Sequence, residues 1–323
     1  MDLLITGSIA YDYLMRFPGR FKEALVSDSL DKISVSFLVH DMTRHQGGVA
    51  ANIAYSVALL GGRPRLMGTV GQDFGDYRRN LELVGVDTST TIELAHLFTA
   101  SFFANTDLDN NQIASFYAGA MGDAGKFSIT DVTDHAPDLV VISPNAPDAM
   151  TNIARECRER GIPYLYDPSQ QTPRTDGDTL RECIEGCTIL AVNEYEWELV
   201  QQKTGLTRDD VMQHGATLIV TKGKHGADIF TGDIHVYTPA IDGVTVADPT
   251  GGGDAFRGGI LRGLQLGGSW ELNGQIGSLL AAYAIEVVGT QNHRFDRHAF
   301  VQRFRQHFDD MGFLDSLLDE HHG

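Results

Sequence analysis

The stretch that decides the fold reads Asp248-Pro249-Thr250-Gly251-Gly252-Gly253-Asp254-Ala255-Phe256. It follows a β-like run at 244–246 and leads into a predicted helix over 253–266. Three consecutive glycines would destabilise the interior of a helix, but at its start they let the backbone approach a ligand closely. The unpaired N–H groups of a first helical turn, together with the helix dipole, attract anions. The stretch therefore predicts a strand, a glycine loop that binds an anion, and a helix.

Asp254 is the unexpected residue of this stretch, because a carboxylate would repel a phosphate resting on the glycine loop. Its position makes sense if it takes the proton from a hydroxyl that attacks phosphorus. The alternative is a first-turn aspartate that only stabilises the helix dipole. We would favour that alternative for an isolated Gly-Gly-Asp, but the whole nine-residue stretch favours a catalytic base.

Strand-like and helix-like segments alternate through most of the chain around this loop. The predicted strands cover 3–8, 65–70, 139–143, 164–167, 189–192 and 217–221. The predicted helices cover 49–60, 77–84, 149–160, a segment from 194, and 253–266. Repeated β-then-α units indicate an α/β fold with a parallel sheet and helices on both faces. In such sheets ligands bind beyond the carboxyl ends of the strands.

Two stretches, 13–44 and 96–121, interrupt this alternation. They carry alternating, aromatic-rich runs at 34–39 and 113–117, which are typical of β-strands outside the main sheet. We interpret them as a small β lid over the active cleft. The alternative is a pair of ordinary surface hairpins.

Charge and cysteine content limit the possible partners and the compartment. The formal net charge of −18 disfavours nucleic acids and anionic membranes, so we expect neither as a partner. Only three cysteines are present, which favours reduced thiols and a cytoplasmic location. The apolar start of the chain lacks a basic region, and we interpret it as the first core strand and not as a signal peptide.

Two motifs resemble the signatures of the PfkB (ribokinase-like) family of carbohydrate and nucleoside kinases. The second signature usually reads Asp-Thr-x-Gly-Ala-Gly-Asp, and here Pro249 and Gly252 replace the common Thr and Ala. The run Gly47-Gly48-Val49-Ala50-Ala51-Asn52-Ile53-Ala54 is similar to the first signature. The resemblance extends from Leu3 to about Phe308. It implies one kinase domain over 1–323, built as a three-layer α/β/α sandwich with a mostly parallel sheet and a small β-sheet lid.

The resemblance also implies which residues bind ATP. Gly251, Gly252 and Gly253 would form the anion hole beside the base Asp254. Asn193 would lie near the ATP phosphates, and Glu196 would hold Mg²⁺ through water, as magnesium often does. The alternative for this pair is an Asn helix cap with a Glu at N3. The family's nucleotide-binding turn would comprise Thr221, Lys222, Gly223 and Gly226.

On the acceptor side, the resemblance implies a sugar-binding carboxylate at Asp12. Such a group can accept hydrogen bonds from two vicinal hydroxyls. Gly47, Gly48 and Asn52 would complete this pocket. Asp248 and Thr250 match positions that help to bind a monovalent cation such as K⁺ in many family members.

The lid indicates the class of acceptor. Its stretches 106–112 and 116–121, with 289–293 near the C-terminus, resemble bacterial adenosine kinases of this family. The flat apolar side chains of the lid offer surfaces on which a purine can stack; they are Phe102, Phe103, Phe116, Tyr117 and Met121. The alternative is that each of them belongs to the core of the lid itself. We therefore expect ATP-dependent phosphorylation of the ribose 5′-hydroxyl of a purine nucleoside, and we expect adenosine to be the preferred acceptor. The alternatives are a ribokinase-like sugar kinase and a non-catalytic nucleoside sensor. The protein would be a monomer or a homodimer.

Overall fold

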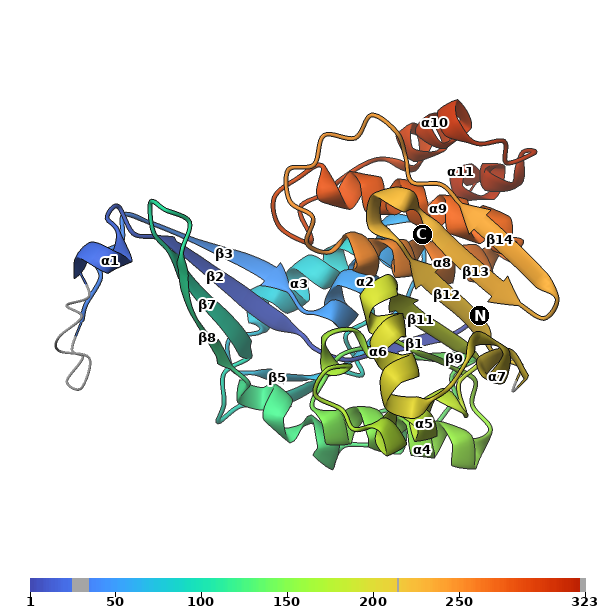
Figure 1. Ribbon diagram of the computed structural model, residues 1–323, viewed down its shortest axis with the longest axis horizontal. Coiled ribbons are helices and arrows are strands. Elements are labelled where there is room, and N and C mark those ends of the chain that lie inside the picture. The colour runs from blue at the N-terminus through green and yellow to red at the C-terminus, as the bar shows by residue number, and fades with distance from the viewer. Residues whose placement is uncertain (25–34, 214, 320–323) are drawn as a thin grey trace.

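A large sheet forms the centre of the molecule (Figure 1). The computed structural model describes residues 1–24, 35–213 and 215–319. The strand order is β14-β13-β12-β11-β10-β9-β1-β4, parallel from β12 to β4 and antiparallel in the pairs β12–β13 and β13–β14. The strands are β1 Leu3–Thr6, β4 Arg65–Met67, β9 Leu139–Ile142, β10 Tyr164–Tyr166, β11 Ile189–Asn193, β12 Thr217–Thr221, β13 Ala227–Thr231 and β14 Ile234–Thr238.

Helices cover both faces of this sheet (Figure 1). One face carries α2 Val49–Leu59, α8 Gly252–Leu266 and α9 Trp270–Ile285, and the other carries α4 Pro147–Arg160, α5 Gly177–Ile184, α6 Glu194–Thr204 and α7 Arg208–Gln213. Successive strand residues point to opposite faces, so Leu3 and Ile5 join one core cluster and Leu4 joins the other. The predicted three-layer α/β/α sandwich with a mostly parallel sheet is confirmed. The remaining helices are α1 Phe21–Ala24, α3 Gly75–Val84, α10 Arg297–His307 and α11 Ser316–Asp319.

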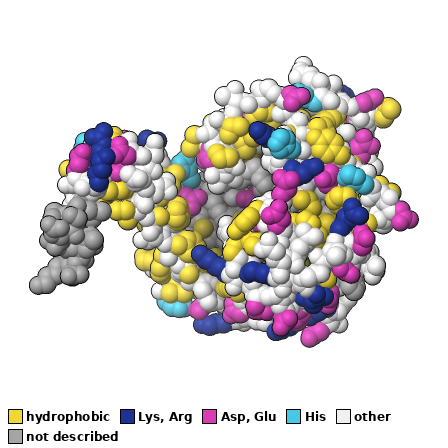
Figure 2. Space-filling model, in the orientation of Figure 1, with side chains coloured by type: hydrophobic (Ala, Val, Ile, Leu, Met, Phe, Trp, Pro, Cys, Tyr) yellow, Lys and Arg dark blue, Asp and Glu magenta, His cyan; other side chains and the backbone are white. Residues whose placement is uncertain are grey.

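A smaller sheet, called the lid sheet below, projects from the core at the left of Figure 1. Its order is β3-β2-β7-β8, with β2 Ala10–Arg16, β3 Asp41–Gly47, β7 Ala100–Thr106 and β8 Gln112–Tyr117. The segments 13–44 and 96–121 supply β7, β8 and parts of β2 and β3. Figure 2 shows an open recess between the lid sheet and the core. A separate pair of short strands, β5 Thr69–Gly71 and β6 Ile92–Leu94, lies beside the core.

Two predictions of strands are wrong. Residues 35–39 lie outside any strand, while Ser34 lies outside the described residues. The edge of β2 is occupied instead by β3, in register from Ala10 opposite Gly47 to Arg16 opposite Asp41. The run 244–246 also lacks a strand, and β14 is the terminal strand at that side of the large sheet.

The thiols behave as expected for core residues. Cys157, Cys183 and Cys187 are free and buried in the cluster under α4 and α5. Within the described ranges, no helix combines the length and the apolar character that crossing a membrane requires.

Candidate active site

The start of α8 is shaped by a left-handed glycine. Gly251 caps the helix with φ 82° and ψ −6°, and a Cβ there would lie 2.9 Å from Thr290 Cγ2. Only glycine adopts this conformation without strain. The loop 248–251 therefore turns sharply against the segment that contains Thr290.

Two amides of the first turn of α8 are available to an anion. Gly252 N reaches Pro249 O at 3.5 Å, and Ala255 N donates to Gly251 O at 2.9 Å. Among the residues that the structure describes, the amides of Gly253 and Asp254 have no hydrogen-bond acceptor. Such amides, at the positive end of a 15-residue helix, form an anion site.

Asp254 lies in the same turn with a side chain that is 14% exposed. Its Oδ2 accepts a hydrogen bond from Asn52 Nδ2 at 2.8 Å, and its Oδ1 lies 3.9 Å from Arg257 Nη1. Burial raises the pKa of Asp254 to about 6, although the Arg257 charge and the Asn52 hydrogen bond oppose this rise. The carboxylate is therefore largely ionised at neutral pH and is more basic than an ordinary aspartate.

Asn52 is held in one orientation by two donors from distant sequence. Thr290 Oγ1 and Gln291 Nε2 both donate to Asn52 Oδ1, at 2.9 and 2.8 Å. With its oxygen so occupied, the amide directs Nδ2 to Asp254. The sequence predicted Asn52 as part of the acceptor pocket, and the structure adds this direct contact with Asp254.

A row of side chains crosses the lid sheet on one face. His45 lies opposite Asp12, Asp12 opposite Phe102, and Phe102 opposite Phe116. Residues opposed across strands share a face, so Asp12 lies beside Phe102, and Phe116 follows on the next strand of the same face. Burial raises the pKa of Asp12, while the neighbouring His45 lowers it.

Gly47 and Gly48 bring the lid row against the core. A Cβ on Gly47 would lie 2.8 Å from Asp12 Oδ2 and 3.7 Å from Thr290 Oγ1. Gly48 has φ 94°, and its Cβ would lie 2.5 Å from Ser8 O. Because Thr290 also contacts Gly251 and Asn52, the face that carries Asp12 is directed to the start of α8.

The other lid aromatics lie elsewhere. Phe103 stacks on Tyr13, with ring centroids 4.8 Å apart, and Tyr117 is also on the face opposite to Asp12. Met121 lies beyond the lid sheet, in a 3-10 segment. Only Phe102 and Phe116 of this aromatic set therefore accompany the carboxylate.

Asn193 and Thr221 lie opposite each other at the carboxyl ends of β11 and β12. Asn193 Oδ1 accepts from Glu196 N, and Glu196 Oε2 accepts from Asn193 N, each at 2.8 Å, so the pair forms the capping box that the sequence left as an alternative. Burial raises the pKa of Glu196, which is 8% exposed. The box fixes the carboxylate at the edge of the sheet where ligands bind.

Lys222 has a partner within the protein. Its Nζ lies 2.7 Å from Asp228 Oδ2 and 5.1 Å from the Tyr237 ring centroid. Lys222 N donates to Gly226 O at 2.7 Å, and Gly226 N donates to Gly223 O at 3.1 Å. The predicted nucleotide-binding residues thus form a tight turn between β12 and β13.

The Asp248 carboxylate accepts hydrogen bonds from two loops, one that contains Thr250 and one that contains Gly289. Its Oδ1 accepts from Thr250 N at 2.9 Å and its Oδ2 accepts from Gly289 N at 3.1 Å. Burial would raise the pKa of Asp248, but these hydrogen bonds outweigh it and lower the pKa. Within the described part of the chain, no three His, Cys, Asp or Glu side chains gather into a metal site.

Sequence reasoning missed two charged residues beside Asp254. Arg257 Nη2 donates to Asp167 Oδ1 at 2.7 Å, and both side chains are buried. The available signals were the position of Arg257 three residues after Asp254, on the same helical face, and the position of Asp167 directly after a buried strand.

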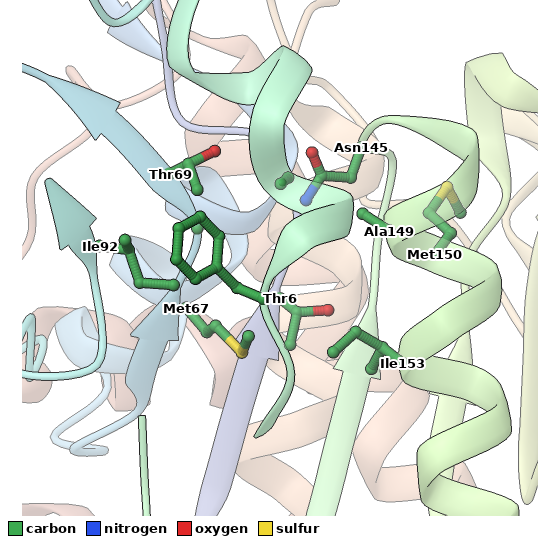
Figure 3. Close-up of a pocket in the computed structure, with 11 residues that line it drawn as sticks. Thr6, Met67, Thr69, Ile92, Asn145, Ala149, Met150 and Ile153 are labelled. Carbon is green, nitrogen blue, oxygen red and sulfur yellow. The ribbon is translucent and has the colours of Figure 1, made fainter. Parts of the chain in front are cut away.

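A small cavity of about 20 Å³ lies near the ends of β1 and β4 (Figure 3). It is lined by Thr6, Met67, Thr69, Ile92, Asn145 and Ile153 among others. A cavity of this size holds about one water molecule, so it is too small for a substrate.

Comparisons with known proteins agree with this geometry. The family model described as pfkB family carbohydrate kinase matches residues 8–296. The nucleoside kinase of Methanocaldococcus jannaschii is 30% identical over 276 residues, which are 85% of this chain and 90% of that protein. The fructokinase of Escherichia coli is 31% identical over 241 residues, which are 68% of this chain and 76% of that protein.

The fold matches a solved structure over nearly its whole length. Ligand-free Burkholderia thailandensis nucleoside kinase superposes with a TM-score of 0.86 at 40% identity, covering 94% of this chain and 99% of that one. The same protein in complex with inosine, and with ADP-inosine, gives a TM-score of 0.81. The chain therefore belongs to the pfkB family of carbohydrate kinases and is a phosphotransferase.

Proposed function

We propose that the protein transfers the terminal phosphate of ATP to the ribose 5′-hydroxyl of a purine nucleoside, with adenosine as the preferred acceptor. The observation that carries the proposal is the row of Asp12, Phe102 and Phe116 on one face of the lid sheet. Neighbouring strands lie ~4.8 Å apart, so this row offers a carboxylate and aromatic surface over ~10 Å, close to the length of a nucleoside. Asp12 would accept hydrogen bonds from two ribose hydroxyls, and stacking of the base on the rings would contribute ~1–3 kcal/mol.

In the proposed reaction, Asp254 is the general base. Its Oδ1 takes the proton of the 5′-hydroxyl while that oxygen forms a bond to the γ-phosphorus. The bond from phosphorus to the β,γ-bridging oxygen breaks, and ADP leaves with that electron pair. The free amides of Gly253 and Asp254, presented by the loop Gly251–Gly253, hold the negative charge of the migrating phosphoryl group. Asn193, Thr221, Lys222, Gly223 and Gly226 would line the ATP side.

The donor set fits a magnesium ion bound mainly by phosphate oxygens and water. Glu196 is an oxygen donor fixed by its capping box at the edge of the sheet. Mg²⁺ commonly uses one or two carboxylates and retains several waters, and when bound it neutralises phosphate charge. Asp248 and Thr250 would contribute to a monovalent-cation site, such as one for K⁺, by fixing the surrounding loop.

Two other acceptor classes have specific support. The inosine complex of the Burkholderia protein favours inosine as a second purine nucleoside. The likeness to a fructokinase keeps a sugar kinase as the alternative. A nucleoside sensor without catalysis is disfavoured, since Asp254 and the free amides would then have no role. We also expect a cytoplasmic monomer or homodimer.

An acceptor panel tests the proposal. ATP consumption would be measured with adenosine, inosine, guanosine, ribose and fructose, with the Asp254→Asn variant as the control for contaminating kinases. We expect the highest kcat/KM for a purine nucleoside, and 5′-monophosphate as the product by phosphorus NMR. Turnover of free sugars without turnover of any nucleoside would contradict the proposal.

A further inference from the structure

Arg257 is a buried cation between carboxylates of different elements. Its side chain is 8% exposed, and its Nη2 donates to Asp167 Oδ1 at 2.7 Å and to Ser169 Oγ at 3.1 Å. Its Nη1 lies 3.9 Å from Asp254 Oδ1, which is too far for a hydrogen bond. The guanidinium is therefore bonded to Asp167 and only near Asp254.

The geometry leaves one oxygen of Asp254 free for a substrate. Asn52 occupies Oδ2, whereas Oδ1 faces the guanidinium without a hydrogen bond to it. A direct pair between Arg257 and Asp254 would occupy Oδ1 and make the carboxylate a poorer proton acceptor. Asp167 and Ser169 both accept from Nη2 and so hold the guanidinium with Nη1 3.9 Å from Oδ1.

Burying the charged guanidinium of Arg257 costs desolvation free energy. An isolated buried ion pair can often be replaced by apolar residues without loss of stability. Here the charged groups that face Asp254 come from three elements: Arg257 on α8, Asp167 after β10, and Glu196 on α6. One buried cation thus compensates several carboxylates around the phosphate site.

We propose that Asp167 and Arg257 form a positioning pair for Asp254: Asp167 holds the guanidinium just beyond hydrogen-bonding distance, where its charge favours the ionised carboxylate and leaves Oδ1 free. This inference rests on the proposed function. In this proposal Arg257 acts through the charge state of Asp254 and contacts neither ATP nor the nucleoside.

The proposal predicts opposite effects for the two partners. Arg257→Gln removes the cation, so the pKa of Asp254 should rise, because burial and the carboxylates then act alone. Asp167→Asn removes an anion and frees the guanidinium to pair with Asp254, so the pKa should fall and the base should weaken.

The test measures kcat and KM from pH 5 to 9 for the full-length chain with its best acceptor. For Arg257→Gln we expect the acid limb of the kcat profile to move up by about one pH unit, so that kcat falls about twofold at pH 7 and about fivefold at pH 6. For Asp167→Asn we expect the acid limb to move down, and Arg257→Lys should restore part of kcat. In each case the KM values for ATP and acceptor should stay within about threefold, since a positioning residue makes no substrate contact.

The control is Arg155→Gln. Arg155 forms a two-bond pair with Glu182, at 2.7 and 2.8 Å, between α4 and α5 on the outside of the molecule. This variant should leave the pH profile unchanged. Melting curves and acceptor binding by calorimetry would verify folding, and Arg257→Lys carries the test if the Gln variant does not fold.

Three results would overturn the proposal. The acid limbs of the two variants could move in the same direction or stay in place, while only the melting temperature falls. Alternatively, Arg257→Gln could raise the KM for ATP at unchanged kcat, which would make Arg257 a phosphate ligand. If the wild-type chain phosphorylates no nucleoside, the proposed function itself fails; if only the limb shifts are missing, this inference alone fails.

Discussion

The side chains at the start of α8 and those on the lid sheet differ in burial and in how far they are bonded to the rest of the protein. Around Asp254, the neighbours Asn52 and Arg257 are buried and bonded to the protein. On the face of the lid sheet that carries Asp12, Phe116 is 54% exposed, and Asp12 and Phe102 are half-buried. The groups that would perform the chemistry are thus fixed in advance, whereas the groups that would select the acceptor are half-buried or, in the case of Phe116, open to solvent. Exposed rings can recover apolar contact only when a ligand covers them.

The largest effect should follow from removing the base. Asp254→Asn should lower kcat by about a thousandfold or more, because general-base catalysis is lost and the neutral amide cannot accept the proton. Binding of the nucleoside, measured by calorimetry, should change less than about fivefold, since the proposed nucleoside contacts of Asp12, Phe102 and Phe116 lie on the lid sheet. Near-normal turnover by this variant would show that the proton goes elsewhere.

The glycine loop should come second. Gly251→Ala strains a residue at φ 82° and places Cβ 2.9 Å from Thr290, so the anion site should distort and kcat/KM for ATP should fall about 100-fold. The matched control is Gly267→Ala at the other end of α8, with φ 81° and no atom within 4 Å of the added Cβ. Both variants should lose about 1 kcal/mol of stability, but only Gly251→Ala should lose activity. Equal activity of the two would exclude the loop from catalysis.

The lid face gives the next effect. Phe116→Ala should raise the KM for the nucleoside about tenfold with little change in kcat, because stacking of the base contributes ~1–3 kcal/mol. Phe103→Ala is the control, since Phe103 lies on the other face and stacks on Tyr13. A larger rise in KM for Phe103→Ala than for Phe116→Ala would mean that the acceptor meets the opposite face.

The smallest effect concerns stability. Burial raises the pKa of Asp254 from 3.8 to about 6, so the folded state carries a cost that is fully present above pH 6 and absent below pH 3.8. Asp254→Asn should therefore stabilise the protein by at most about 3 kcal/mol at pH 8, with the gain vanishing near pH 4, as measured by urea unfolding.

Asp310→Asn is the control of opposite sign. Hydrogen bonds from Arg305 lower the pKa of Asp310, so its substitution should destabilise the protein at pH 8. If Asp254→Asn is less stable than wild type at pH 8, the carboxylate is not disfavoured by its surroundings.

Local sequence determined the main elements of this protein. The glycine run 251–253 predicts a helix start with free amides, because its signals lie within one turn. The alternation of strands and helices predicted the α/β sandwich, because each strand or helix is signalled within its own short segment of sequence. The strands expected at 35–39 and 244–246 were wrong because a strand exists only where it pairs with a neighbour, and neither run is paired in the structure.

Only the tertiary structure decided how the site is assembled. The contact between Asn52 and Asp254 joins residues 202 positions apart, and the pair of Arg257 and Asp167 joins residues 90 positions apart. The register of the lid strands decided that Phe102 and Phe116, and not Phe103, share a face with Asp12, because a shift of one residue reverses every side chain. Short-range patterns specify elements, but the side chains that meet depend on register and on long-range packing, which no local pattern contains.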